Sequence, residues 1–253
     1  MPLSAPKAAP DRRLRVLTYN VRRCLGVDGR YSPERIADVL AECEADVIGL
    51  QELDVGRLRS GGIDQAEVIA RQLGFDHVHF HPALQRGEEL YGDAILTRAP
   101  SKLMRAGALP TPTGWRPVET RGAVWVSLDG ALLQILNTHF GLGRRERRLQ
   151  AAALMGSDWL GRSPQTTPLV LLGDLNSVPG GRVYRALRSR LLDANARGKP
   201  TFPTFRPLLR IDHIFVSASI AITGSRVHRS ALARIASDHF PLHADLVLPG
   251  EPV

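Results

Sequence analysis

The sequence has only two cysteines, Cys24 and Cys43, among its 253 residues. Two cysteines are too few for a disulfide framework, and Cys43 lies on the apolar face of a predicted helix, where we expect a buried thiol. No apolar run approaches the roughly 20 residues of a membrane span, and the amino-terminal segment lacks the apolar stretch of a signal peptide. These absences predict a soluble, cytoplasmic protein.

Several well-known binding motifs are also missing. The chain has no CxxC and no HExxH, which argues against a structural zinc site and against a zincin protease. It has no Walker loop and no GxGxxG, so cradling of a nucleotide by a glycine-rich loop is not indicated. Aromatic residues make up only 6% of the chain, which predicts a core of Leu, Val, Ile and Ala.

The composition that remains is that of an ordinary globular protein, with 43% hydrophobic and 23% charged residues. The formal net charge is +8, carried mainly by arginine. Such a charge favours anionic partners, namely nucleic acid, phosphorylated metabolites or acidic lipid headgroups, without choosing among them. A GC-rich genome, which encodes arginine where other genomes encode lysine, would explain the same arginine excess equally well.

We expect one continuous domain over residues 14–248, between a disordered leader at 1–13 and a tail at 249–253, because no linker or repeat interrupts it. Ser32 and Asp64 are predicted to begin helices, and a third helix is predicted from about Arg144 to Leu160. Strands and helices interleave, which indicates an α/β or α+β fold. The predicted strands are Leu14–Val21, Asp46–Gln51, Asp93–Thr97, Gly122–Leu128, Leu132–His139, Leu169–Gly173, Ile211–Val216 and His243–Leu248.

Polar side chains recur where these apolar strands end. They occur in the segments TYNVR, QE, NTH, GDLN, DH and SDH. Grouped carboxylates repel one another and are costly to bury unless a cation or hydrogen bonds compensate. Carboxylate and amide oxygens suit a hard ion such as Mg²⁺ or Mn²⁺. The pattern therefore predicts a divalent-metal site at the strand ends.

The same segments resemble the endonuclease/exonuclease/phosphatase superfamily, which includes deoxyribonuclease I. GDLN followed by SDHFP is the specific part of the resemblance, which runs from about residue 14 to 248. The matching segments are LTYNVR, IGLQE, YGDAILTR, ETRGAVWV, LNTHFGL, LLGDLNSVPGG, TFPTFRPLLRIDHIFVS and SDHFPLHADL. The resemblance implies a four-layer sandwich of two mostly antiparallel sheets flanked by helices, with the active site at one end.

The resemblance also implies a metal site. Glu52 would be the principal metal ligand, Asn20 would bind or orient the metal, and Asp238 would lie beside it. A metal and protonated histidines supply the positive charge that phosphate oxygens need during in-line attack.

The remaining catalytic roles follow from the same resemblance. Asp174 would orient and deprotonate the attacking water, and Asn176 would hydrogen-bond a phosphate oxygen. His239, held by Asp212, would donate to the phosphoryl oxygen in the transition state. His139 would stand opposite His239 across the scissile phosphate. An Asp partner orients an imidazole and favours its cationic form.

Three further residues are candidates for binding or tuning. Arg121 and Arg144 could contact the anionic substrate, although a solvated helix face is the usual role of a run such as Arg144–Arg148. Asp93 is a departure, because many superfamily members have Asn there. An acid at this position could pair with His139, assist metal binding or alter substrate choice.

Structural roles compete with these assignments. Asp174, Asn176 and Asp238 are also common turn formers, and Glu52 could be an exposed strand end. His213 alternates away from Asp212 along its strand and is expected to be structural. The other histidines, His77, His79, His81, His228 and His243, are expected to be surface or packing residues, and Trp115 and Phe205 could stack on a base or sugar or simply pack.

The sequence therefore favours a metal-dependent phosphodiesterase, with a nuclease as one possibility. A phosphomonoesterase or phosphodiesterase acting on lipid or inositol phosphate headgroups is the alternative within the same chemistry. A catalytically inactive basic module that binds nucleic acid or membranes is the alternative of another class. Turnover with a divalent ion would separate the enzymes from the binding module.

Overall fold

Two six-stranded sheets form the centre of the protein. The computed structural model describes residues 12–112, 119–128, 133–162 and 167–249. In spatial order, the first sheet consists of β11 (Ala221–Val227), β12 (Leu242–Leu248), β1 (Arg12–Asn20), β2 (Val47–Val55), β4 (Glu89–Thr97) and β3 (His77–Arg86). The second consists of β5 (Ser101–Ala108), β6 (Gly122–Leu128), β7 (Leu133–His139), β8 (Leu169–Asp174), β10 (Asp212–Val216) and β9 (Leu192–Asp193).

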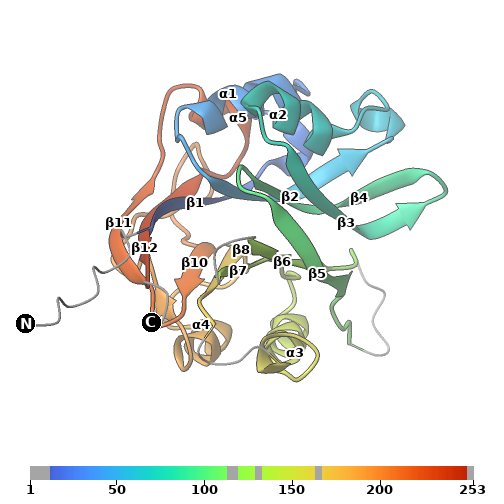
Figure 1. Ribbon diagram of the computed structural model, residues 1–253. Helices are drawn as coiled ribbons and strands as arrows, with labels where there is room; N and C mark the ends of the chain where they lie inside the picture. Colours follow the sequence, from blue (N-terminus) through green and yellow to red (C-terminus); the bar gives the residue numbers. More distant parts are fainter. Residues whose placement is uncertain (1–11, 113–118, 129–132, 163–166, 250–253) are drawn as a thin grey trace, which may run out of the picture.

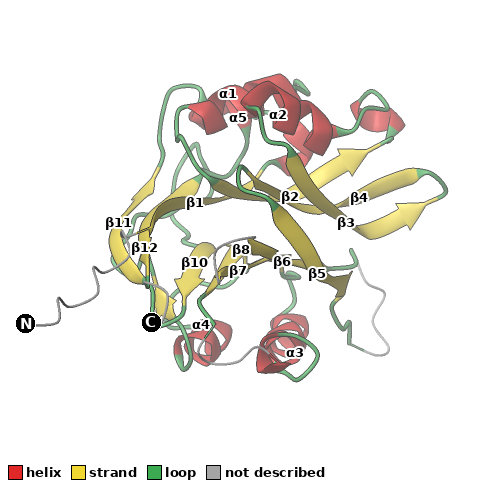
Figure 2. Cartoon of the chain, in the orientation of Figure 1, coloured by secondary structure: helices red, strands yellow, loops and turns green. Residues whose placement is uncertain are grey.

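Helices cover the outer faces of both sheets (Figure 1). The first sheet carries α1 (Pro33–Ala41), α2 (Gln65–Leu73) and α5 (Ala233–Ala236), and the second carries α3 (Arg144–Met155) and α4 (Arg182–Arg188). Figure 2 shows the resulting order of helices, sheet, sheet and helices. This is the four-layer sandwich that the resemblance implied, and every strand pairing except β1–β2 and β7–β8 is antiparallel.

Local signals in the sequence explain where the first helices begin and end. The Ser32 side chain accepts a hydrogen bond from the backbone N–H of Arg35, and Pro33 occupies the first turn of α1. The Asp64 side chain caps α2 in the same way, through the N–H of Glu67. Gly74 then ends α2 in a left-handed conformation with φ of 67°.

Apolar side chains fill two regions. The larger core lies between the sheets and under α1, α2 and α5, and it includes Cys43, which is buried as expected. The smaller core packs the second sheet against α3 and α4, around Trp125, Phe140 and Trp159. Because both faces of the central strands are covered, those strands are apolar without strict alternation.

A polar contact crosses the interface between the sheets. The side-chain amide of Gln51 on β2 donates to Oδ1 of Asn137 on β7 at 2.7 Å. Nδ2 of Asn137 donates in turn to the carbonyl oxygens of Leu50 and Ala94 in the first sheet. These buried groups are hydrogen-bonded to one another, so the contact fixes how the two sheets align.

The two parallel pairs determine where the polar strand ends meet. Asn20 at the end of β1 lies beside Gln51 of β2, and His139 at the end of β7 lies beside Asp174 at the end of β8. Asp174 is also the antiparallel neighbour of Asp212 on β10. Parallel strands end at the same edge of a sheet, and so these tips gather at one end of the sandwich.

Some elements differ from the sequence-based expectations. β3, β5, β9, β11, α4 and α5 were not predicted. β3 and β5 lie at sheet edges and are largely half-exposed or exposed, so they lack the continuous apolar run that marks the central strands. The third helix ends at Met155 rather than at Leu160, because the next residue, Gly156, takes an extended conformation.

The structure describes the two ends of the chain only in part. β1 begins at Arg12, two residues before the expected strand start at Leu14, because Arg12 and Arg13 pair with Leu248 and Val247. The rest of the leader and residues 250–253 of the tail lie outside the described residues, as do Trp115 and Leu132. Among the described residues, no helix has the length and apolar character needed to cross a membrane.

Candidate active site

The strand ends line one cavity of about 690 Å³. All of the predicted site residues reach it except Asp212 and Asp93, which lie behind its wall. The predicted residues that line the cavity are Asn20, Glu52, Arg121, His139, Arg144, Asp174, Asn176, Asp238 and His239. Residues as far apart in sequence as Asn20 and His239 therefore share one pocket.

Glu52 enters the cavity from a β-bulge in β2. The pairing of β2 with β4 shifts between Leu50 and Leu53, and Glu52 has a positive φ of 64°. A bulge of this kind changes the direction of a side chain relative to the strand. Nδ2 of Asn20 donates to Oε1 of Glu52 at 3.0 Å. Burial raises the pKa of Glu52, but the charge of His139 and the Asn20 hydrogen bond outweigh it, and the net pKa is lowered.

Asp174 is the buried carboxylate at the centre of the site. Its Oδ2 lies 3.4 Å from Nε2 of His139, 3.8 Å from Nε2 of His239 and 3.2 Å from Nδ2 of Asn20. Its Oδ1 accepts the backbone N–H of Asn176 at 2.8 Å. Burial raises the pKa of Asp174, but these histidines and the Asn176 N–H lower it well below its usual range. Asp174 is therefore an ionised carboxylate at neutral pH.

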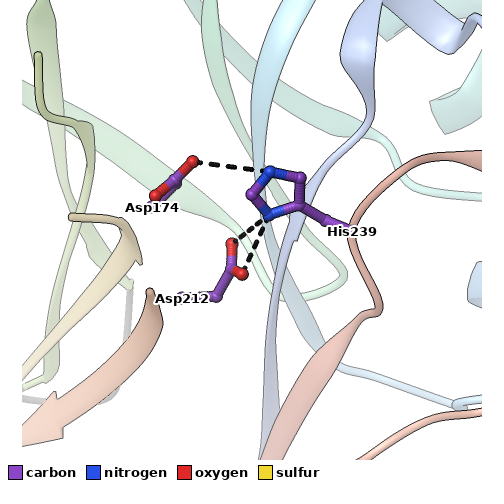
Figure 3. Close-up of side chains that lie close together, drawn as sticks. All are labelled: Asp174, Asp212 and His239. Atoms are coloured by element: carbon purple, nitrogen blue, oxygen red, sulfur yellow. Dashed lines mark hydrogen bonds and ion pairs between the residues drawn. The ribbon is translucent and has the colours of Figure 1, made fainter. Parts of the chain in front are cut away.

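His239 lies between two carboxylates (Figure 3). Nδ1 is 2.9 Å from Oδ2 of Asp212, and Nε2 faces Asp174 on the other side of the ring. Burial lowers the pKa of His239, but the charge and hydrogen bond of Asp212 more than compensate and raise it to about 10. The ring of Phe202 covers His239 at a centroid distance of 4.7 Å. His239 is thus an imidazolium held in one orientation.

His139 is held by a different kind of partner. NH1 of Arg121 lies 2.9 Å from Nδ1 of His139, and NH2 of Arg121 lies 3.1 Å from a carboxylate oxygen of Glu119. Nε2 of the same ring faces Asp174 at 3.4 Å. Burial and the charge of Arg121 lower the pKa of His139, but Asp174 and Glu52 raise it more, and the net pKa is raised. Nδ2 of Asn176 donates to the carbonyl oxygen of Phe140 at 2.8 Å, which holds that amide beside His139.

Asp93 does not pair with His139. Its Oδ1 accepts the backbone N–H of Glu52 at 3.4 Å, so it supports the bulge from behind, while Arg121 occupies the partner position at His139. Burial raises the pKa of Asp93 to about 6, although the charges of His139 and Arg121 oppose the shift. Of the three alternatives for this acid, the structure therefore does not show the pairing with His139, and it places Asp93 as a buried acid behind Glu52.

Asp238 also lines the cavity. Its Oδ2 lies 3.4 Å from Nε of Arg22, and the neighbouring Ser237 hydroxyl donates to the carbonyl oxygen of Asn20 at 2.8 Å. Burial raises the pKa of Asp238, although the charges of His239 and Arg22 oppose this shift. The contact between Ser237 and Asn20 brings the segment that carries Asp238 against the end of β1.

The donor atoms near Glu52 fit a hard divalent cation. Among the described residues, the Asp, Glu and His ligand atoms that gather within 4.8 Å of one another belong to Asp174, Asp212 and His239. In this cluster His239 faces Asp212 at Nδ1 and Asp174 at Nε2. Glu52 instead opens into the cavity beside the amide of Asn20, with no ion pair to any described cation. Oxygen donors of this type suit Mg²⁺ or Mn²⁺.

Arginines surround the cavity. Arg144 and Arg148 at the start of α3 and Arg182 at the start of α4 line it, and all three are exposed. Arg147 also lines it and donates to the backbone carbonyl oxygens of Gly141 and Leu142. The run that begins at Arg144 is therefore partly a wall of the cavity rather than only a solvated helix face.

Several residues at the site were not identified from the sequence. Arg22, Glu119, Ser237 and Phe202 contact predicted site residues through the interactions described above. Glu119 is two positions before Arg121, just ahead of β6, and the closeness of an acid and a base in the ETR segment could have indicated the pair. His213 lies outside the cavity, where its Nε2 donates to the carbonyl oxygen of Ser177 and its ring stacks on Phe215.

Comparisons with known proteins agree with this architecture. The model of the Endonuclease/Exonuclease/phosphatase family matches residues 17–239. The uncharacterized protein YbhP of Escherichia coli K12 is 25% identical over 260 residues, which cover 96% of this chain and all of YbhP.

Two solved structures share the fold. An endonuclease/exonuclease/phosphatase from Beutenbergia cavernae has a TM-score of 0.76 and 24% identity, covering 96% of this chain and 73% of its own. The mannosyl-6-phosphatase Bt3783 of Bacteroides thetaiotaomicron has a TM-score of 0.74 and 24% identity, covering 93% of this chain and 100% of its own. With the family model spanning nearly the whole sandwich, the chain belongs to the endonuclease/exonuclease/phosphatase family of phosphate-ester hydrolases.

Proposed function

We propose that the protein is a divalent-cation-dependent phosphodiesterase that acts by in-line attack of water. The observation that carries the proposal is the position of Asp174, an ionised carboxylate between Nε2 of His139 and Nε2 of His239 at the floor of a cavity rich in arginine. A buried base beside two proton donors is the arrangement needed to activate water and to stabilise an anionic phosphoryl group.

Each of these residues has its own role in the proposed reaction. Asp174 orients a water molecule and accepts its proton. His239 donates a hydrogen bond to a phosphoryl oxygen as charge develops there, because Asp212 keeps it protonated. His139 donates from Nε2 on the opposite side, and the amide of Asn176 hydrogen-bonds another phosphate oxygen.

Glu52, with Asn20 and Asp238, would hold Mg²⁺ or Mn²⁺. When bound, the cation would supply positive charge that neutralises the phosphate oxygens. Arg121 stands behind His139, and Arg144 at the cavity wall would attract the anionic substrate. The alternative is a phosphomonoesterase or phosphodiesterase that acts on lipid or inositol phosphate headgroups. The fold shared with the mannosyl-6-phosphatase Bt3783 supports the monoesterase form of this alternative.

The proposal is tested by hydrolysis of a generic bis-aryl phosphate with Mg²⁺ or Mn²⁺, before and after EDTA treatment. We expect Asp174→Asn and His239→Gln to lower kcat by about two to four orders of magnitude. Asp158→Asn and His228→Gln are matched controls, because neither residue lines the cavity. Wild-type activity in both site variants would remove these residues from the mechanism.

A broader screen separates the substrate classes. DNA, RNA, abasic DNA, phospholipids, inositol phosphates and small phosphodiesters are compared as substrates under the same two cations. Salt-sensitive binding of DNA or anionic lipid with no turnover of any ester would instead identify an inactive basic binding module.

A further inference from the structure

Large apolar side chains are exposed at the mouth of the charged cavity. Leu142, Val178 and Leu209 all line it, with 68%, 43% and 42% of their surfaces exposed. Single exposed apolar residues are ordinary on protein surfaces, but several around one opening are unusual. The floor of this cavity is built from carboxylates and histidines. A small hydrophilic ester bound there would gain nothing from apolar side chains at the mouth.

The loop between Thr201 and Arg210 adds two more such side chains. Phe205 is 78% exposed and Leu208 is 64% exposed. The base of the loop is closed by the bridge between Phe202 and Leu209. The loop is also fixed to the site, since the N–H of Thr204 donates to the carbonyl oxygen of Asp238 at 2.9 Å. Phe205 and Leu208 are therefore held beside the active-site segment without apolar cover.

Cationic side chains alternate with these apolar ones. Arg144, Arg148 and Arg182 line the same mouth, and within the described residues none of them forms an ion pair with a carboxylate. Arg206 is exposed at the tip of the loop, between Phe205 and Leu208. Apolar side chains interspersed with arginine are typical of surfaces that rest in the interface of an anionic membrane.

We propose that the mouth of the cavity docks onto an anionic lipid surface. Phe205 and Leu208 enter the boundary between headgroups and acyl chains, and the arginines lie against the headgroup phosphates. A protein partner seated here would block access to Asp174, whereas a lipid surface covers the mouth and at the same time presents phosphate esters to it. Nucleic acid would match the arginines, and Phe205 could stack on a base, but the exposed aliphatic side chains of Leu142 and Leu208 would find no apolar partner there.

Docking itself does not depend on the hydrolysis proposed above. Only the further conclusion, that the substrate is a phosphate ester carried by the membrane, rests on that proposed function. Binding and turnover are therefore measured separately, so that failure of one can be told from failure of the other.

The experiment is co-sedimentation of the full chain with vesicles of phosphatidylcholine alone or mixed with phosphatidylglycerol. We expect binding to the anionic vesicles that weakens as salt rises. In the double variant Phe205→Ser with Leu208→Ser, binding should fall at least about ten-fold, because most of the inserted apolar area is lost. Arg206→Gln should weaken binding roughly five-fold.

Leu58→Ser with Leu103→Ser is the matched control, since both leucines are exposed and neither lines the cavity. It should bind vesicles like the wild type. The Phe205/Leu208 double variant should also keep the wild-type rate on a soluble bis-aryl phosphate, which shows that it is folded.

Absence of wild-type binding to anionic vesicles, or equal binding by the double variant and the wild type, would overturn the proposal. Vesicle binding without hydrolysis of any ester would support docking and contradict the proposed hydrolase activity.

Discussion

NH1 of Arg121 lies 2.9 Å from Nδ1 of His139, so the two histidines that flank Asp174 are held by partners of opposite charge. His239 has the carboxylate of Asp212 at its Nδ1, which favours an imidazolium. At His139 burial and the guanidinium of Arg121 lower the pKa, but the hydrogen bond and charge of Asp174 outweigh them, and the net pKa is raised. The site thus places two histidines around a single carboxylate, one held by an acid and the other held against an arginine.

Removing the guanidinium should make His139 easier to protonate. In Arg121→Met, we expect the pKa of His139 to rise, because the repulsion from Arg121 is lost. The rate should fall roughly 10- to 100-fold, since the ring also loses its orientation. Titration of the imidazole protons by NMR in EDTA checks the first effect, with Arg148→Met as the control. An unchanged pKa would show that Arg121 does not set the state of His139.

Removing the carboxylate of Asp212 should have the opposite electrostatic effect. In Asp212→Asn, the pKa of His239 should fall from about 10 towards its ordinary value, because the charge that stabilises the imidazolium is gone. We expect kcat at pH 8 to fall by about two to four orders of magnitude. Part of the rate should return at lower pH, where the ring is protonated again. A pH-independent loss would indicate that Asp212 only orients the ring.

The buried acid behind Glu52 should make stability depend on pH. Because burial raises the pKa of Asp93 to about 6, the folded state binds its proton more tightly than the unfolded state does. The contribution of Asp93 to the free energy of unfolding should therefore decrease as pH rises from about 4 to 6. In Asp93→Asn this loss is absent, and above pH 7 the metal-free variant should be up to about 3 kcal/mol more stable than the wild type.

Urea unfolding at pH 4, 6 and 8 in EDTA measures this difference. The amide keeps an oxygen that can accept the N–H of Glu52, so the bulge has the same hydrogen bond in the variant. A stability difference between variant and wild type that is the same at all three pH values would contradict a raised pKa for Asp93.

Gly173, which precedes Asp174, should not tolerate a side chain. Its φ is 147°, and a Cβ atom there would lie 1.9 Å from the carbonyl oxygen of Thr138 on β7. Gly173→Ala should therefore destabilise the fold by at least about 3 kcal/mol, through backbone strain and displacement of β7. Gly180→Ala is the control, because its φ is 80° but its Cβ would meet nothing within 4 Å. It should cost about 1 kcal/mol, and equal losses in thermal or urea unfolding would refute the steric argument.

Much of the fold and of the site could be predicted from local sequence. A continuous apolar run followed by a polar tip marks a central strand and its end, as at Leu169–Asp174, because burial on both faces leaves no room for alternation. Ser32 and Asp64 mark helix starts for an equally local reason, the unsatisfied N–H groups of the first turn. The edge strands β3 and β5 carry no such signal, since their pairing depends on neighbours far away in the chain.

The sequence by itself determined the chemical character of the site, namely acids, amides and histidines at strand ends, because that character belongs to single residues and their immediate neighbours. Only the tertiary structure decided which partners they have. It gave His139 an arginine instead of Asp93, placed Asp93 behind the Glu52 bulge, and left Phe205 and Leu208 exposed beside the catalytic segment. These outcomes depend on how two sheets pack across large sequence separations, and pairing at such range is set by the whole core rather than by any local pattern.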